Sequence, residues 1–269
     1  MLIDYLMNNM GLTHKKAKQV LTNKQVLVNN KVITKYNYLI KDKDVVSINE
    51  YGNSKINNID IIYEDKDIIV VNKPSGILTI ASSSEKEKTL YHLVGTYLKE
   101  RNKFAKVFII HRLDKDTSGI VMFAKNDKVK KLYQDKWNDL VKYRGYVAIL
   151  EGILPKEKDT IKLNLDDSDE FKVRVSKNGK EAITEYKVIK TSNNLSLVDI
   201  NLHTGRRNQI RVTFSYLNHP VLGDFKYGSK VKAKRLMLHA YKLSVINPFT
   251  KKEMVFETKT PKEFNNYLK

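Results

Sequence analysis

The stretch His111-Arg112-Leu113-Asp114-Lys115-Asp116-Thr117-Ser118-Gly119 runs directly into the strongly apolar segment Ile120-Val121-Met122-Phe123-Ala124. Turn-forming residues before an apolar run of this length predict a polar loop that opens into a buried strand. The loop places a carboxylate, Asp114, two residues after the guanidinium of Arg112. Because a nearby opposite charge favours the charged form of an acid, we expect Asp114 to be ionised at neutral pH, as a nucleophilic or proton-abstracting aspartate must be. Asp116 to Gly119 have the size and hydrogen-bonding capacity of ordinary turn residues.

Strand and helix signals alternate on both sides of this loop. Two apolar runs, 59–63 and 67–73, flank a charged turn and predict a β-hairpin, and the periodicity of 127–142 predicts a helix. Its expected core residues are Val129, Leu132, Leu140 and Val141. Further strands are predicted at 146–150, 182–189, 195–202, 237–245 and 254–256, and a further helix at 209–217. Short strands with interspersed helices predict an α+β fold with a mixed, mostly antiparallel sheet over 59–269.

Residues 1–50 form a separate small module in this prediction. It combines helices over 2–7 and 12–21, the second with Thr13 as a plausible N-cap, a hairpin over 26–32 and a strand over 44–48. The polar segment 51–58 is the expected linker. The module resembles an S4-type RNA-binding domain, which implies that Lys15, Lys16 and Lys18 on its second helix contact RNA. A solvated amphipathic helix is the alternative interpretation of these lysines.

Composition narrows the possible chemistry of the chain. Of its 269 residues 41% are apolar, which favours folded domains over disorder. There is no cysteine, and the six histidines include no close pair at metal-ligand spacing, so we expect no transition-metal cofactor. No run is long and apolar enough to span a bilayer and the N-terminus has no signal-peptide pattern, so we expect a cytoplasmic protein without membrane contact. The net charge of +19 predicts an anionic partner, nucleic acid by default, although a lysine-rich solvated surface is the alternative.

The distribution of arginine sharpens this prediction. Most of the 49 basic residues are lysines, so arginine is expected to persist where its planar, bidentate fork is needed. The arginines are Arg101, Arg112, Arg144, Arg174, Arg206, Arg207, Arg211 and Arg235. Three of them lie within 206–211 and one lies beside Asp114, which points to phosphate or carboxylate recognition at these places.

Several motifs occur in a fixed order along the chain. They are Val71-Asn72-Lys73-Pro74-Ser75-Gly76, the loop 111–119, Tyr143-Arg144-Gly145-Tyr146-Val147-Ala148-Ile149-Leu150-Glu151-Gly152, Leu202-His203-Thr204-Gly205-Arg206-Arg207-Asn208-Gln209-Ile210-Arg211-Val212, His219-Pro220-Val221-Leu222-Gly223-Asp224 and Arg235-Leu236-Met237-Leu238-His239-Ala240. In this order the chain resembles the RluA-type pseudouridine synthases, in the branch that carries an N-terminal S4 domain and acts on large-subunit ribosomal RNA. The resemblance extends over essentially the whole chain, and its most specific motif is 111–119. It implies that uridine within RNA is isomerised to pseudouridine without a cofactor.

The resemblance also implies roles for individual residues. Asp114 matches the essential aspartate, Arg211 the arginine that pairs with it, and Tyr146 the active-site tyrosine. Arg112 matches a residue that enters the RNA stack beside the flipped base. Lys73 is expected to line the cleft as loop structure, with substrate contact a lesser possibility, while Arg206 is expected to hold phosphates or brace the site. Arg207-Asn208 and Arg144 depart from the usual Thr-His and Lys, which would affect the choice of RNA rather than the chemistry.

Two other functions stay open at this point. The same chemistry on transfer RNA would require no other residues, and a non-catalytic ribosome assembly factor could use the same basic scaffold. An inert RNA-binding protein would have no reason to keep an acid such as Asp114 facing an anionic ligand, which favours the enzyme. The sequence leaves the identity of the uridine open, and a monomer is expected.

Overall fold

The structure is a computed structural model, and it describes residues 1–22, 25–29, 31–48, 55–56, 59–81 and 89–268. The N-terminal unit contains the helices α1 (Leu2–Asn8) and α2 (His14–Thr22) and the strands β1 (Val26–Val28), β2 (Lys31–Val32) and β3 (Val46–Ile48). The strands form an antiparallel sheet in the order β2-β1-β3, so the predicted hairpin over 26–32 is confirmed.

Helix α2 of this unit is amphipathic. Thr13 accepts the backbone N–H of Lys16 at 3.3 Å, as expected of an N-cap. Ala17, Val20 and Leu21 pack into the core of the unit, while Lys15, Lys16 and Lys18 are exposed. The three lysines therefore take no part in the core of the unit, and their side chains are accessible to a ligand.

The second unit is built on one large sheet, with described strands in the order β11-β10-β12-β13-β9-β14-β8-β6-β5-β4 and with β15 and β7 beside β14 and β8. Its strands are β4 (Lys55–Ile56), β5 (Ile59–Glu64), β6 (Ile68–Lys73), β7 (Phe108–Ile109), β8 (Ser118–Ala124), β9 (Val141–Glu151), β10 (Lys158–Asp166), β11 (Arg174–Val175), β12 (Lys180–Ser192), β13 (Leu195–Leu202), β14 (Leu238–Ile246) and β15 (Glu253–Glu257). Among these pairs only β8 and β14 run parallel, which confirms the α+β fold with a mostly antiparallel sheet.

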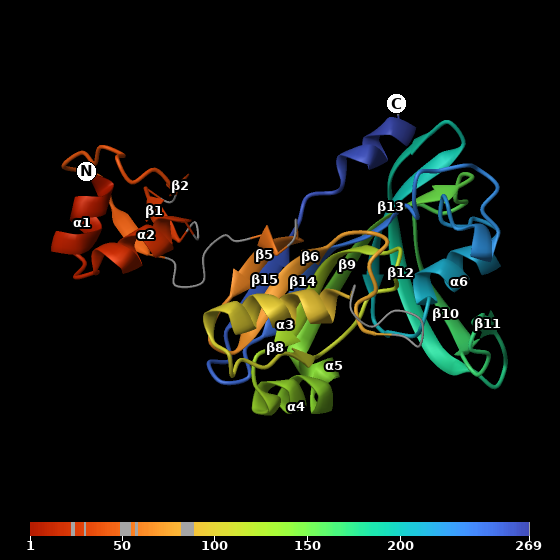
Figure 1. The fold of residues 1–269 in the computed structure, drawn as a ribbon. Helices are drawn as coiled ribbons and strands as arrows, with labels where there is room; N and C mark the ends of the chain where they lie inside the picture. Colours follow the sequence, from red (N-terminus) through yellow and green to blue (C-terminus); the bar gives the residue numbers. More distant parts are fainter. Residues whose placement is uncertain (23–24, 30, 49–54, 57–58, 82–88, 269) are drawn as a thin grey trace.

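Helices cover both faces of this sheet (Figure 1). They are α3 (Leu90–Arg101), α4 (Asp127–Asp135), α5 (Trp137–Leu140) and α6 (Gln209–Tyr216), with short 3₁₀ turns η1 (Phe225–Tyr227) and η2 (Lys262–Tyr267). Strand β8 is buried along its whole length, because Val121 and Phe123 pack with α3 on one face while Ile120 and Met122 pack with α4 on the other. This double burial explains why its sequence is continuously apolar rather than alternating.

The prediction for residues 127–142 needs correction, and some elements of this unit gave no signal in the sequence. The helix predicted over 127–142 ends at Asp135, is followed by the single turn α5, and gives way to β9 at Val141. Val129 and Leu140 are buried as predicted, but Leu132 and Val141 are half-buried. Helix α3 and strands β10 and β11 were not predicted, the strands because their residues are largely polar and exposed.

The expected linker over 51–58 falls mainly outside the described residues. Within it, Lys55–Ile56 form β4, which pairs with β5, so this part of the segment belongs to the large sheet. Among the described residues, no helix is both long and apolar enough to cross a membrane.

Candidate active site

The loop that carries Asp114 lies between β7 and β8, at the point where β8 meets β14. Gly119 has a φ of +120°, and a Cβ at this position would lie 2.1 Å from the carbonyl oxygen of Ala240. Only glycine permits so close an approach of the two backbones. The close approach accompanies the parallel pairing of Gly119 with Ala240, and it fixes the end of the loop from which Asp114 projects.

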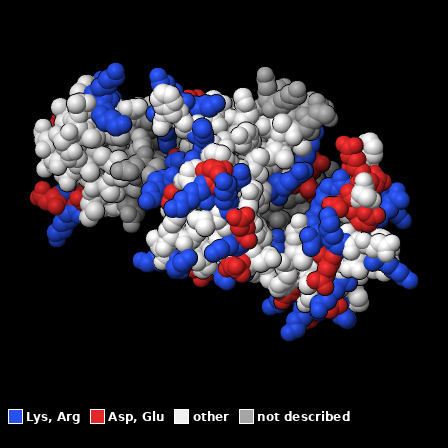
Figure 2. Space-filling view, turned by 90° about the horizontal axis from the view of Figure 1, so that it is seen from below, with Lys and Arg blue, Asp and Glu red and all other residues white. Residues whose placement is uncertain are grey.

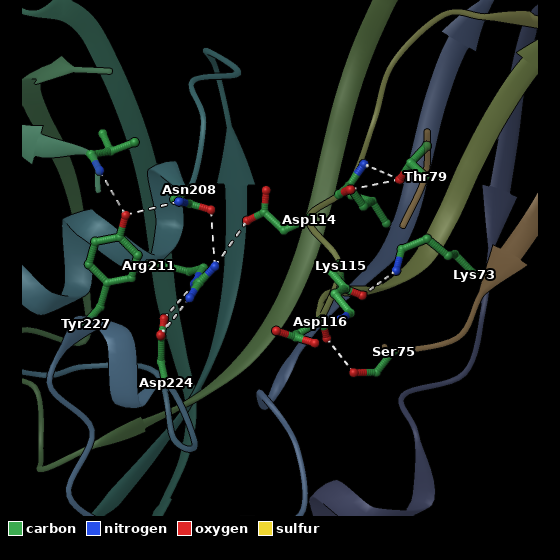
Figure 3. Close-up of polar contacts among 12 residues, drawn as sticks. Lys73, Ser75, Thr79, Asp114, Lys115, Asp116, Asn208, Arg211, Asp224 and Tyr227 are labelled. Atoms are coloured by element: carbon green, nitrogen blue, oxygen red, sulfur yellow. Dashed lines mark hydrogen bonds and ion pairs between the residues drawn. The ribbon is translucent and has the colours of Figure 1, made fainter. Parts of the chain in front are cut away.

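A second loop, after β6, holds the Asp114 loop by its backbone (Figure 3). The Thr79 hydroxyl donates to the carbonyl of Leu113 at 2.8 Å and accepts its N–H at 3.1 Å. On the other side of Asp114, the carbonyl of Lys115 accepts the N–H of Gly76 at 2.9 Å, and Ser75 donates to the carbonyl of Asp116. The backbone on both sides of Asp114 is thus fixed, so its side chain starts from a defined position.

Lys73 also binds the backbone of the Asp114 loop, from inside the protein. Its side chain is 0% exposed, and its ammonium donates to the carbonyls of Pro74, Ile77 and Lys115 at 2.7–3.0 Å. Burial lowers the pKa of Lys73 to about 7, although Asp116 and Asp114 favour its charged form. This geometry favours the interpretation of Lys73 as loop structure over direct contact with RNA, because the ammonium is buried and its three hydrogens are all donated to carbonyls.

The structure brings Asp114 and Arg211 together, as the sequence predicted. The Arg211 guanidinium lies 3.7 Å from the Asp114 carboxylate. Its principal partner, however, is Asp224, whose two oxygens accept from Nε and Nη2 at 2.7 Å each (Figure 3). Asp224 is buried, and a bidentate pair of this kind is strong and directional. One arginine is therefore shared between two carboxylates. The motif 219–224 that contains Asp224 gives no sign of this role in the sequence.

Two further side chains hold the Arg211 guanidinium from the other side. Asn208, which precedes α6 with a left-handed φ of +53°, accepts from Arg211 at 3.1 Å and donates to the Tyr227 hydroxyl at 3.0 Å. The ring of Tyr227 lies beneath the guanidinium, 4.9 Å from centroid to Cζ. Tyr227 is buried and also accepts the N–H of Val173. Asn208, a departure from the family motif, thus has a structural task in the ion-pair network.

The pKa of Asp114 depends on burial as well as on the neighbouring charges. Its side chain is 24% exposed, and burial raises its pKa above the ordinary value of an aspartate, although Arg211, Arg112 and Lys73 favour the ionised form. The nearby charge of Asp224 raises this pKa further. The guanidiniums therefore offset burial without outweighing it, so burial decides the direction in which the pKa of Asp114 is shifted.

Asp114 lines a cavity of about 500 Å³ whose wall also contains Arg112, Tyr146, Arg206 and Arg211. Arg112 and Arg206 are exposed, and Arg206 is oriented by a bond from its Nε to the carbonyl of Glu181. The cavity is therefore rimmed by guanidiniums with one carboxylate, Asp114, at its floor. Figure 2 shows lysine and arginine side chains spread widely over one face of the molecule, with carboxylates between them.

Tyr146 is neutral in this cavity. Burial raises its pKa to about 12, with Arg144 acting in the opposite direction and Asp114 in the same direction. Arg144 lies 5.8 Å from the centroid of Trp137, and both residues line the cavity wall. A neutral phenol and an indole offer π-faces rather than charge to a bound base.

Two histidines near the site, His111 and His239, have structural roles. Nε2 of His111 accepts the N–H of Met122 at 3.0 Å, and burial lowers the pKa of this histidine to about 4. His239 lies between Ser118 and Thr258, and burial lowers its pKa to about 4 as well. Arg235 donates to Ser118, to two backbone carbonyls and to Glu263, so it braces the site.

Among the described residues, no group of three or more carboxylates and histidines is arranged to hold a metal ion. The arrangement instead offers one carboxylate with raised pKa, one fixed arginine and aromatic walls. Such a site can perform nucleophilic or acid–base chemistry on an anionic ligand that carries a flat base.

Comparison with known proteins identifies the class of protein that this site belongs to. A family model for "RNA pseudouridylate synthase" matches residues 67–216, and an S4 domain model matches residues 1–46. The chain therefore belongs to the RNA pseudouridylate synthase family and is an RNA pseudouridine synthase.

Individual relatives agree with this placement. The chain is 34% identical to "Uncharacterized RNA pseudouridine synthase YhcT" of Bacillus subtilis, over 93% of this chain and 84% of the relative. It is 37% identical to "Ribosomal large subunit pseudouridine synthase D" of Borreliella burgdorferi, over 78% of this chain and 68% of the relative. Its fold is similar to that of human RNA Pseudouridylate Synthase Domain Containing 1, with a TM-score of 0.62 and 26% identity over 77% of this chain and 86% of that one.

Proposed function

We propose that this enzyme isomerises uridine to pseudouridine in large-subunit ribosomal RNA, with Asp114 as the essential catalytic residue. The observation that carries this proposal is the position of Asp114 at the floor of an arginine-rimmed cavity, 3.7 Å from a guanidinium that is fixed by a second carboxylate. Its similarity to a relative named for the large ribosomal subunit supports this class of RNA.

The reaction requires the target uridine to leave the RNA stack. Flipping a nucleotide costs a few kcal/mol, and the cost falls when the protein supplies new stacking partners. Arg112 is exposed at the rim of the cavity, where its planar guanidinium can fill the vacated space while contacting phosphate. Tyr146 lies in the wall, where its ring can stack on the uracil.

The chemistry at the floor of the cavity needs only a carboxylate. The N-glycosidic bond breaks, the uracil turns within the cavity, and its C5 bonds to C1′ of the ribose with loss of the C5 proton. Asp114 serves this sequence either by attacking C1′ or by accepting a sugar proton, and both tasks require its ionised form. Arg211 and Arg112 favour that form against the effect of burial.

The basic N-terminal unit supplies the second part of the interface. Lys15, Lys16 and Lys18 are exposed on one helix, and ammonium groups so placed neutralise phosphates without reading sequence. Arg206 at the cavity rim is the corresponding phosphate contact in the catalytic unit. We therefore propose RNA binding at both units.

Tritium release tests this function, because loss of the C5 proton accompanies every turnover. The RNAs are large-subunit ribosomal RNA and bulk transfer RNA labelled at uridine C5, and the proteins are wild type and Asp114→Asn. We expect wild type to release tritium from the ribosomal RNA, and the variant to release none while binding it with nearly unchanged affinity. Release only from transfer RNA would overturn the proposed substrate, and substantial release by the variant would remove Asp114 from the catalytic role.

A further inference from the structure

One side of the 3₁₀ turn η1 contacts Arg211, and the other side is exposed. Residues three apart in a 3₁₀ turn lie one above the other. Asp224 and Tyr227, three apart, both point inward, where Asp224 binds Arg211 and the Tyr227 ring lies under its guanidinium. The residues between them, Phe225 and Lys226, are consequently directed away from the ion-pair network and are exposed.

Phe225 is therefore exposed for a structural reason, and its exposed fraction is 62%. It lines a groove of about 860 Å³. Arg211 belongs to the walls of both this groove and the cavity of Asp114, so the two spaces adjoin at the catalytic ion pair. Figure 3 shows the residues on the two sides of this junction, with Asp224 and Arg211 opposite Asp116 and Ser75.

The charges of the groove favour an anionic occupant. Asp224 is bound by Arg211, and Glu263 is paired with Arg235 at 3.3 Å, so these acids are compensated. Lys226 and Lys234 also line the groove, and within the described part of the chain neither has a carboxylate at ion-pair distance. Asp116 is the remaining acid, so the two lysines leave a surplus of positive charge.

We propose that this groove is a second nucleotide subsite, in which a base of the RNA outside the reaction cavity stacks on Phe225 while Lys226 and Lys234 bind the adjoining phosphates. The proposal rests on the proposed function, because the groove adjoins the cavity that receives the target uridine. An exposed aromatic ring beside lysines is the combination with which proteins bind single-stranded segments of RNA. The subsite thus takes an unpaired nucleotide of the strand that carries the target.

The test compares the affinity of Phe225→Ser and wild type for large-subunit ribosomal RNA by filter binding, so it does not depend on turnover. Loss of a stacked base is expected to raise Kd by roughly 5- to 150-fold. Phe104→Ser is the matched control, because Phe104 is also a largely exposed phenylalanine and lies outside the walls of both cavities. An unchanged Kd for Phe225→Ser would overturn the subsite, whereas tight binding without tritium release by wild type would overturn the proposed function alone.

A double variant, Lys226→Gln with Lys234→Gln, tests the phosphate contacts independently. The slope of log Kd against log salt concentration is expected to fall by about 2, which is about 1 for each lost contact. Phe225→Ser is expected to leave this slope unchanged, because stacking releases no counterions. A double variant with the wild-type slope would remove both lysines from the RNA interface.

Discussion

Asp224→Asn tests the role of Asp224 in holding Arg211 without altering the catalytic candidate Asp114 itself. The substitution keeps the size of the side chain but removes the charge that faces the Arg211 fork, where both carboxylate oxygens now accept at 2.7 Å. Asp224 is buried and Arg211 is nearly so, and removal of one partner from such a pair costs about 3–5 kcal/mol. Since Asp114 lies only 3.7 Å from Arg211 and partly compensates its charge, we expect the lower end, about 3 kcal/mol.

Thermal unfolding measures this loss. For a unit of this size, about 3 kcal/mol corresponds to a fall in Tm of roughly 6–12 °C. Asp135→Asn is the control, since it alters an exposed aspartate at the end of α4 for which the structure shows no ion pair among the described residues, and its effect is expected to stay within about 0.5 kcal/mol. A loss below about 1 kcal/mol for Asp224→Asn would refute the assignment of Asp224 as the principal partner of Arg211.

The same variant has a kinetic signature. Without Asp224, the nearest carboxylate to Arg211 is Asp114, and the charge of Asp224 no longer raises the pKa of Asp114. The acidic limb of the pH–rate profile is therefore expected to move to lower pH. At the same time Arg211 itself is displaced from its position beside the reacting groups, and an error near 1 Å in such a position typically costs roughly 100-fold in kcat. A simple loss of stability would change the temperature limit of activity but not the position of the acidic limb.

Three further perturbations follow from the same structure. Lys73→Met should remove a rise in the free energy of unfolding with pH. The folded-state pKa of Lys73, about 7, lies below the unfolded value near 10.4, so between these limits the unfolded chain binds more protons than the folded one. Urea unfolding from pH 7 to 10 measures the wild-type slope, which approaches ~1 kcal/mol per pH unit, and an identical slope in the variant would refute the assignment. Tyr146→Phe should retain more activity than Tyr146→Leu in tritium release, since a phenol with a pKa of about 12 is neutral and its ring is the main group offered to the base; equal losses would contradict this ranking. Replacing Lys15, Lys16 and Lys18 together by glutamine should lower the salt slope of RNA binding by up to about 3, and an unchanged slope would leave the interpretation of a solvated helix.

The sequence predicted the elements whose residues are selected by burial. Strand β8 is apolar because both its faces are covered, and β13 and the β5–β6 hairpin have patterns that local chemistry alone specifies. Strand β10 was missed because most of its side chains are exposed or half-exposed, so its pairing with β12 leaves little apolar signal. The helix over 127–142 was overextended because the transition from α5 to β9 at Val141 depends on pairing with β14, more than 100 residues away in sequence.

The sequence predicted which residues meet at the site but not which partners they bind. Asp114, Arg112, Tyr146, Arg206 and Arg211 do line one cavity. The burial of Lys73 could not be predicted, because it depends on the fold, which directs the side chain inward to carbonyls of its own loop and of Lys115. Asp224 was missed as a partner because an aspartate after a glycine has the appearance of a turn residue, and only the packing of η1 against α6 shows what it binds.

The division of Arg211 between two carboxylates bears directly on the chemistry proposed for Asp114. An aspartate that attacks C1′ or accepts a sugar proton needs a free lone pair, and a bidentate arginine would occupy both of its oxygens. In this structure the Asp224 carboxylate binds the Arg211 guanidinium at 2.7 Å. The Asp114 carboxylate lies 3.7 Å from the guanidinium, close enough for electrostatic attraction but without a hydrogen bond. Burial raises the pKa of Asp114 and so increases its basicity, and Arg211 together with Arg112 limits that rise. The second carboxylate thus lets one arginine stabilise the charge of the first without occupying the oxygens that the reaction requires.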